Sequence, residues 1–282
     1  MRKSILLALS LALCSPAFAA MKEVNGHWVH EYPTRSQALT HAAGSSNLTY
    51  HGGSVLSAAK VVPIYWGTYW NSVSGAAQRS TMNLFFQQFG TNSHYGVLTQ
   101  YYDTVGGTTR FIGLSTLLST GAAGWSDASN PSSARVTDAM VQAEVNKYLA
   151  THAFNSQAIY EVFIGPGYYS YDGGATSCGG TNLRYCAYHG AYFANGHTIK
   201  YSIEPYPSCS GCHATGFTTL QDMQHFAGHE TREAVTDPVN AWWNPTTGYE
   251  ADDQCAWSPA PFVDGGYGYQ YEWSNRAGGC VR

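Results

Sequence analysis

The sequence predicts a single α+β domain in which a mixed β-sheet packs against helices and disulfides hold the loops. Three observations lead to this fold class. Short apolar runs typical of buried strands alternate with longer segments whose apolar residues recur at helical spacing. These segments do not repeat as regular strand–helix–strand units, which favours α+β over α/β. No Pro/Ser-rich linker and no internal repeat divides residues 47–282.

Three segments predict strands and two predict ordinary helices. Residues 61–66, 159–164 and 198–203 are the expected strands, and each ends close to Gly or Pro. Residues 75–89 are expected to be helical, because the chain places Met82 and three Phe residues on one face. A second helix is expected to begin at Ser132 or Ser133 as N-cap and to bury a stripe that includes Val141 and Val145.

A third helix is expected to begin at Thr218 or Thr219, either of which can cap it. It continues to about Val235, and Asp237-Pro238 then stops it, because the residue before proline is disfavoured in helical conformation. The tail after this helix is rich in Gly and aromatic residues, which predicts loops tied down by disulfides.

The N-terminus predicts a cleavable secretory signal over residues 1–19. Arg2 and Lys3 give a positive start, residues 5–13 form a short apolar run, and Ala-Phe-Ala at 17–19 fits the small-x-small cleavage pattern. We therefore expect a secreted protein, periplasmic or extracellular. No later segment approaches about 20 uncharged apolar residues, so no transmembrane segment is expected. Residues 20–46 are polar and aperiodic, which predicts an N-terminal arm, a linker or a pro-segment.

The composition excludes some partners. The chain has 18 Asp and Glu residues against 14 Lys and Arg residues, and two of the latter lie in the predicted signal peptide. Nucleic acid and anionic membranes require a basic surface, so we expect neither as a partner. The sequence also lacks a Gly-x-Ser-x-Gly elbow, a phosphate-binding glycine loop and a dinucleotide fingerprint.

The cysteines predict three disulfides. One of the seven, Cys14, falls in the predicted signal peptide, and an even number remains in an exported chain. A thiolate zinc site on the Cys-Ser-Gly-Cys segment at 209–212 is the alternative, which an oxidising compartment disfavours. Six cysteines allow 15 pairings. Nearness in the sequence suggests the pairs Cys178–Cys186, Cys209–Cys212 and Cys255–Cys280.

The third predicted helix carries the residues most typical of a metal site. His225, His229 and Glu233 follow at intervals of four residues, so all three project from one helix face. Glu230 lies about 100° further around the helix, within reach of anything bound there. This is the layout of a zincin helix, in which Glu230 would be the general base. Glu233 stands where the usual motif has histidine, and carboxylate is also a zinc ligand.

Further ligands are expected from the acidic segment that follows. Glu250 and Asp253 stand at a distance along the chain that suits a third ligand, and seven of the 18 acids lie between residues 222 and 253. Clustered carboxylates are costly unless a cation neutralises them. Zn²⁺ is the expected ion, and Mn²⁺ or Ca²⁺ stay open because carboxylates outnumber histidine. His189, close to a predicted disulfide, is a candidate ligand or substrate contact, whereas His225 could simply pack or pair with an acid.

These motifs together resemble the Exordium, or phosphate-induced protein, family, known chiefly from secreted plant cell-wall proteins. The closest match is His-Glu-x-x-Glu-Ala-x-Thr-Asp-Pro-x-Asn-Ala-Trp at 229–242, and most of the domain is covered. The resemblance implies that His189, Glu233, Glu250 and Asp253 belong to the site beside His229, and it gives His225 no counterpart. The other matching segments lie at 48–56, 64–67, 160–164, 186–190, 209–212 and 250–255, with Tyr271, Trp273 and Cys280 at the end.

The sequence therefore predicts a secreted zinc-dependent hydrolase, similar to a metallopeptidase, that acts on a peptide or cell-wall substrate. His229, Glu233 and Glu250 would hold the ion, with Asp253 and His189 as further ligands or supporting partners, and Glu230 would take a proton from the attacking water. The alternative is a non-catalytic extracellular module with a structural metal, whose Tyr and Trp residues bind cell-wall glycan or protein. An open coordination position above an accessible cleft would distinguish the two.

Overall fold

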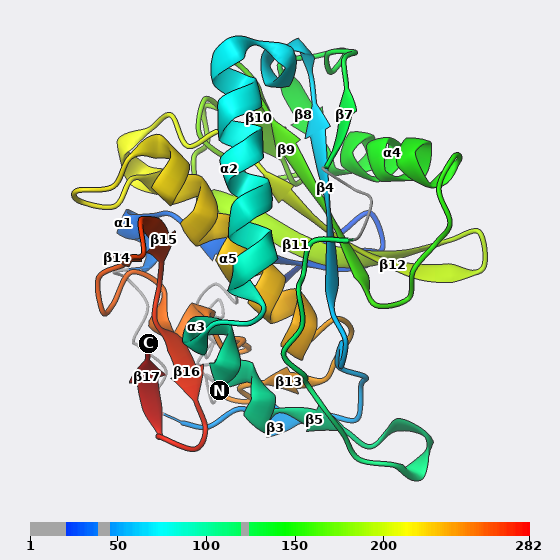
Figure 1. The fold of residues 1–282 in the computed structure, drawn as a ribbon, viewed down its shortest axis with the longest axis vertical. Coiled ribbons are helices and arrows are strands. Elements are labelled where there is room, and N and C mark those ends of the chain that lie inside the picture. Colours follow the sequence, from blue (N-terminus) through cyan, green and yellow to red (C-terminus); the bar gives the residue numbers. More distant parts are fainter. Residues whose placement is uncertain (1–20, 39–45, 120–123) are drawn as a thin grey trace, which may run out of the picture.

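The computed structural model describes residues 21–38, 46–119 and 124–282, and a seven-stranded mixed sheet forms its centre (Figure 1). The predicted signal peptide at 1–19 lies outside the described residues. The first four strands pair antiparallel and the last four pair in parallel. In spatial order the strands are β1 (Met21–Val24), β2 (His27–Pro33), β11 (Tyr185–Ala194), β12 (His197–Glu204), β9 (Ala158–Ile164), β4 (Lys60–Trp66) and β7 (Trp125–Asp127).

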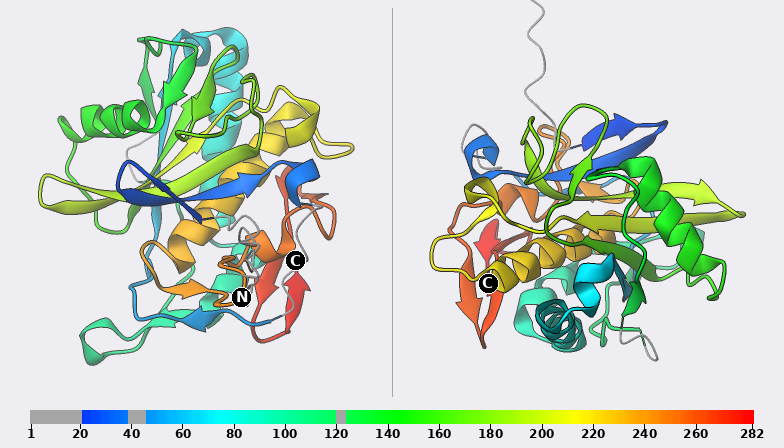
Figure 2. Two further views of the ribbon diagram at one scale, coloured as in Figure 1. Left: turned by 180° about the vertical axis from the view of Figure 1, so that it is seen from behind. Right: turned by 90° about the horizontal axis from the view of Figure 1, so that it is seen from above.

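Helices cover both faces of this sheet, which confirms the predicted α+β class. The described α-helices are α1 (Arg35–Ala38), α2 (Val73–Phe89), α3 (Ser93–Gly96), α4 (Asp138–Leu149) and α5 (Thr219–Thr236). Helices α2 and α5 lie on one face and α4 lies on the other (Figures 1 and 2). Short paired strands complete the fold: β3 (Thr49–Tyr50) with β13 (Trp242–Trp243), β5 (Tyr102–Asp103) with β6 (Arg110–Phe111), β8 (Arg135–Thr137) with β10 (Tyr169–Tyr171), β14 (Phe262–Asp264) with β15 (Tyr267–Tyr269), and β16 (Glu272–Ser274) with β17 (Gly279–Val281).

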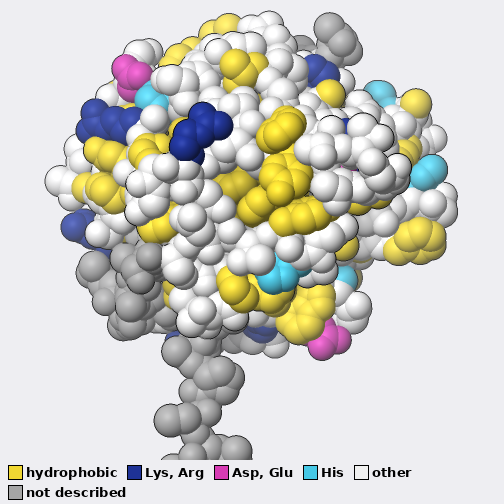
Figure 3. All heavy atoms as spheres, turned by 90° about the horizontal axis from the view of Figure 1, so that it is seen from below, with side chains coloured by type: hydrophobic (Ala, Val, Ile, Leu, Met, Phe, Trp, Pro, Cys, Tyr) yellow, Lys and Arg dark blue, Asp and Glu magenta, His cyan; other side chains and the backbone are white. Residues whose placement is uncertain are grey.

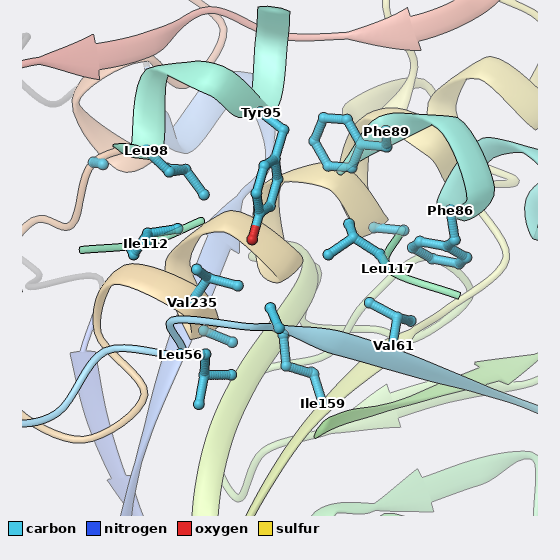
Figure 4. Packing of buried hydrophobic residues seen from close by; sticks show 14 of the residues in the cluster. Leu56, Val61, Phe86, Phe89, Tyr95, Leu98, Ile112, Leu117, Ile159 and Val235 are labelled. Atoms are coloured by element: carbon cyan, nitrogen blue, oxygen red, sulfur yellow. The ribbon is translucent and has the colours of Figure 1, made fainter. Parts of the chain in front are cut away.

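The two layers of helices follow from the side-chain alternation of the central strands. In β4, Val61 joins the core under α2 and α5, whereas Val62 joins the core under α4. Figure 4 shows the first of these cores, where Val61 and Ile159 from the sheet face Phe86 of α2 and Val235 of α5. Because both faces of β4 and β9 are covered, these strands are apolar along most of their length, and the sequence predicts them well.

Two of the predicted helix starts are confirmed and one is wrong. Helix α2 agrees with the expected 75–89 segment, and Thr218 caps α5 in a reciprocal capping box with Gln221. Helix α4 begins at Asp138 rather than at Ser132 or Ser133. The reason is that β8, at residues 135–137, first pairs with β10, so the chain stays extended until the N-cap Thr137.

The segment at 20–46, expected as an arm, a linker or a pro-segment, contributes two strands to the main sheet. Strand β2 pairs with β11 over most of its length, and β1 forms the sheet edge beside it. Val29 and Tyr32 are fully buried, but polar residues separate them. The pattern is therefore too sparse to predict a strand from local sequence, and the strand forms because β11 offers it a partner.

Three disulfides form, but only one of the suggested pairs is right. Cys255–Cys280 is confirmed. The other two pairs are Cys178–Cys209 and Cys186–Cys212, in place of Cys178–Cys186 and Cys209–Cys212. A short 3₁₀ turn at Ser210–Cys212 places Cys209 next to Cys178 and Cys212 next to Cys186, so nearness in the sequence does not predict these pairs. All six cysteines are used, which leaves no thiolate for a zinc site among them.

The surface carries little charge. On the face seen in Figure 3, hydrophobic side chains lie between uncharged polar ones, and Lys, Arg, Asp and Glu are scattered. This agrees with a chain in which only 11% of residues are charged. Among the described residues, no helix has the length and apolar character that crossing a membrane requires.

Candidate metal centre

The candidate centre is built around α5, a helix with polar residues that nevertheless lies inside the protein. Every residue from Asp222 to Thr236 is buried, because α5 is packed between the main sheet, α2 and the C-terminal strands. A helix buried on all sides is normally apolar all round. Here the side facing β11 and β12 carries His and Glu residues, and buried ionisable groups require partners.

The sheet presents a matching row of polar residues to α5. His30 of β2 lies directly opposite His189 of β11. Ser202 of β12 lies opposite His189, and Glu161 of β9 lies opposite Ser202. Residues opposite one another share a face of the sheet. Thr231 of α5 donates a hydrogen bond to Glu161 at 2.6 Å, so the row lies beneath the helix.

The first ligand group joins α5 to the loop that follows β13. His229 Nε2 lies 3.0 Å from Glu233 Oε2 and 3.9 Å from Asp253 Oδ1. The backbone N–H of Asp253 donates to the other oxygen of Glu233 at 2.9 Å, which aligns the loop with the helix. We call His229, Glu233 and Asp253 the helix triad.

The second ligand group joins the sheet to the same loop. His30 Nδ1 lies 2.7 Å from Glu250 Oε2, and His189 Nε2 lies 3.4 Å from the same oxygen. The two imidazole rings are stacked, with centroids 4.9 Å apart. We call His30, His189 and Glu250 the pocket triad.

His189 also connects the two triads. Its Nδ1 forms a hydrogen bond with Glu230 Oε2 at 3.0 Å and lies 3.8 Å from Glu233 Oε2. Seven side chains with nitrogen or oxygen ligand atoms therefore form one continuous cluster in the described part of the chain: His30, His189, His229, Glu230, Glu233, Glu250 and Asp253.

The close contacts in this cluster are compatible with the spacing of metal ligands, and several of them lack hydrogen-bond geometry. Four ligands held tetrahedrally about 2.0–2.1 Å from Zn²⁺ lie about 3.3 Å from one another. Within the described residues, His229 Nε2, His189 Nε2 and both oxygens of Glu250 make no hydrogen bond of acceptable geometry, although acidic or basic atoms lie close to each. Buried polar atoms without hydrogen bonds are rare in native proteins, so this donor set fits a bound cation.

The electrostatics also favour a cation. Burial lowers the pKa of His189 and of His229, so both rings are neutral, which is the state that binds a metal. Burial also raises the pKa of Glu230, Glu233 and Glu250 well above the usual range, and the neighbouring carboxylates raise it further. Four acids this close together cannot all ionise without a positive charge among them.

Arg232 of α5 holds the acidic loop against the helix. Its guanidinium makes a two-pronged ion pair with Asp252 and lies 3.3 Å from Glu272 on β16. Asp252 directly precedes Asp253, so this pair positions the loop that provides two of the candidate ligands. The Cys255–Cys280 disulfide fixes the far end of the same loop to β17.

A pocket of about 380 Å³ opens beside the pocket triad. His30 and His189 line it, together with the aromatic rings of Trp28 and Trp243 and the carboxyl group of Asp237. Trp28 is 53% exposed, so the pocket begins at the surface. The helix triad is not part of the pocket lining, and His229 within it is fully buried.

Except for His225, the structure brings the predicted site residues into one cluster, in which the candidate ligands form two triads. Asp253, rather than Glu250, stands with His229 and Glu233, whereas Glu250 stands with His189. His225 lies apart, where its Nε2 bonds with Tyr32 and Gln270. His30 is a member that sequence reasoning missed, because it lies in the segment expected as an arm. The chain matches no protein-family model, no curated protein and no solved structure at a significant level. The resemblance to the Exordium family therefore stays a prediction.

Proposed function

We propose that this protein is a secreted zinc-dependent hydrolase that cleaves peptide bonds. The observation that carries the proposal is the helix triad, in which His229 Nε2 and Glu233 Oε2 lie 3.0 Å apart without hydrogen-bond geometry, one helical turn from each other and beside Asp253. Three disulfides fit an oxidising compartment, and the predicted signal peptide supports export. The motifs shared with the Exordium family add a cell-wall setting to this proposal.

The residues around the triads suit hydrolysis. A bound Zn²⁺ would supply Lewis-acid polarisation of the scissile carbonyl. Glu230 would take a proton from the attacking water and pass it to the leaving amine. His189 forms a hydrogen bond with Glu230 at 3.0 Å and thereby holds this side chain in one orientation. The Trp28 and Trp243 rings at the pocket offer an apolar contact for a substrate side chain.

The substitution Glu230→Gln tests this function. The amide keeps the side-chain volume but cannot accept the proton, so hydrolysis of casein or of a peptide library should fall about 10²- to 10⁴-fold while the bound zinc remains. Glu144→Gln is the matched control, because Glu144 is also buried but lies on α4, across the sheet. Activity that persists in Glu230→Gln would refute the base assignment.

A structural metal is the second candidate, and one observation favours it. His229 and Glu233 are at most 1% exposed and do not line the pocket, so an ion at the helix triad would lack a substrate-facing position. In that case the wild-type protein holds zinc, shows no hydrolysis on any substrate, and unfolds when a chelator removes the metal. Zinc-dependent cleavage by the wild type would exclude this candidate.

A further inference from the structure

We propose that His30, His189 and Glu250 form a second metal site, which takes Zn²⁺ at the base of the pocket. The site goes beyond the proposed function, because the pocket triad shares no residue with the helix triad. The two triads are adjacent, since His189 Nδ1 lies 3.8 Å from Glu233 Oε2, but each has three ligands of its own.

The fold assembles the pocket triad from three distant segments. The register of β2 against β11 places His30 and His189 opposite each other, on the face of the sheet that α5 covers. Glu250 reaches them from the loop after β13, and its Oε2 lies 2.7 Å from one ring and 3.4 Å from the other. Two imidazole nitrogens and a carboxylate oxygen are a ligand set that Zn²⁺ prefers.

Ordinary ion pairing does not account for this contact. A protonated histidine that pairs with a carboxylate directs an N–H bond at the oxygen. Within the described residues, neither His30 Nδ1 nor His189 Nε2 meets Glu250 in that geometry. Glu250 is fully buried, its oxygens make no hydrogen bond of good geometry with either ring, and its side-chain hydrogen-bonding neighbour Asp237 is another acid. A cation between the two rings and the carboxylate would satisfy all of these atoms at once.

Glu230 prepares His189 for this role. In the tautomer in which His189 Nδ1 carries the proton of its hydrogen bond with Glu230, the lone pair of the ring is on Nε2, which lies 3.4 Å from Glu250 Oε2. A carboxylate that fixes the tautomer of a ligand histidine is a common supporting contact at zinc sites. Glu230 is thus a positioning residue for the pocket triad, whatever its part at the helix triad.

The second site borders the pocket, whereas no residue of the helix triad lines it. His30 and His189 line the pocket and Glu250 does not, so an ion held by the three would border the pocket on the side of the two rings. Catalytic zinc sites have three protein ligands and a fourth position open to a cavity, whereas structural sites have four protein ligands. The ion of the pocket triad would therefore be the one that a substrate reaches.

Zinc stoichiometry tests the inference. The full chain as secreted is freed of metal with a chelator, and Zn²⁺ alone is then titrated by calorimetry and counted by elemental analysis. Wild-type protein should take two equivalents, and His30→Ala should take one, with affinity at the lost position reduced by more than about 100-fold. His27→Ala is the matched control, because His27 lies on the same strand and lines the same pocket but bonds with Tyr201.

The outcomes separate this site from the proposed function. If His30→Ala still binds two equivalents of zinc, the pocket site is refuted. It is also refuted if the wild type binds a single equivalent of zinc that only His229→Ala removes. A single equivalent that only His30→Ala removes would support the pocket site and refute the helix triad. If His30→Ala does not fold, Glu250→Gln keeps the buried volume and should also lose one equivalent. Zinc anomalous diffraction of wild-type crystals should show an ion bonded to both His30 and His189, and an empty pocket triad at saturating zinc would refute the inference.

Discussion

Arg232→Met should destabilise the protein strongly, because Arg232 is the cation that neutralises two buried acids. Its side chain is 2% exposed and pairs with Asp252 and Glu272, which are fully buried. Methionine would fill most of the volume and pack against Phe89, over whose ring the guanidinium now lies. It would leave both carboxylates without a counter-charge in an apolar interior.

The magnitude follows from these contacts. Removing one partner of a buried ion pair costs about 3–5 kcal/mol, since the remaining charge loses its compensation. For a domain of this size each kcal/mol lowers Tm by about 2–4 °C, which gives a decrease of about 6–20 °C. The double variant Arg232→Met/Asp252→Asn should recover part of the loss, because it removes one of the uncompensated acids.

Thermal unfolding followed by circular dichroism measures this effect, with Arg276→Met as the control. Arg276 is exposed, so its substitution should change stability by no more than about 0.5 kcal/mol. Arg232→Met should also weaken zinc binding at the helix triad, because Asp252 positions Asp253. A Tm within about 2 °C of the control would show that the Arg232 network contributes little, and the reasoning would fail.

Two further predictions concern the rest of the fold. Peptide mapping under non-reducing conditions should recover Cys178 with Cys209 and Cys186 with Cys212, and mapping that returns the sequence-adjacent pairs would contradict the structure. Replacing Cys186 and Cys212 together by Ala should lower the free energy of unfolding by about 3–4 kcal/mol, because this bond closes a loop with a sequence separation of 26. Burial and the neighbouring Asp127 raise the pKa of Glu144 from 4.5 to about 8, so its stabilising contribution is present below pH 4.5 and is lost as pH rises through 8. Glu144→Gln should therefore gain stability relative to wild type between pH 5 and 8 in urea titrations, and a constant difference would argue against the shift.

The elements that were predicted correctly are those whose own residues determine their structure. Strands β4 and β9 are apolar on both faces, and α5 carries its own N-cap at Thr218 and its own stop at Asp237-Pro238. The residues of strand β2 do not by themselves predict a strand. It forms because the distant β11 pairs with it, and long-range pairing leaves little trace in a seven-residue window.

The same distinction applies to the site. His229, Glu230 and Glu233 were predictable, because helical spacing alone places them together. The division of Glu250 and Asp253 between two triads was not predictable, since the path of the loop depends on Arg232 and on the Cys255–Cys280 bond. His30 could have been found only by recognising that HWVHEYP at 27–33 is a strand in which histidines flank the buried Val29.

The order in which the chain contributes the pocket triad has a consequence for its biogenesis. His30 precedes Glu250 by more than 200 residues and therefore leaves the ribosome well before it, and β2 cannot pair with β11 until β11 has emerged. Contacts this far apart in sequence form late, because loop closure must precede them. In a nascent chain these three side chains are therefore separate, and the candidate site that they form together is assembled only when the sheet is complete.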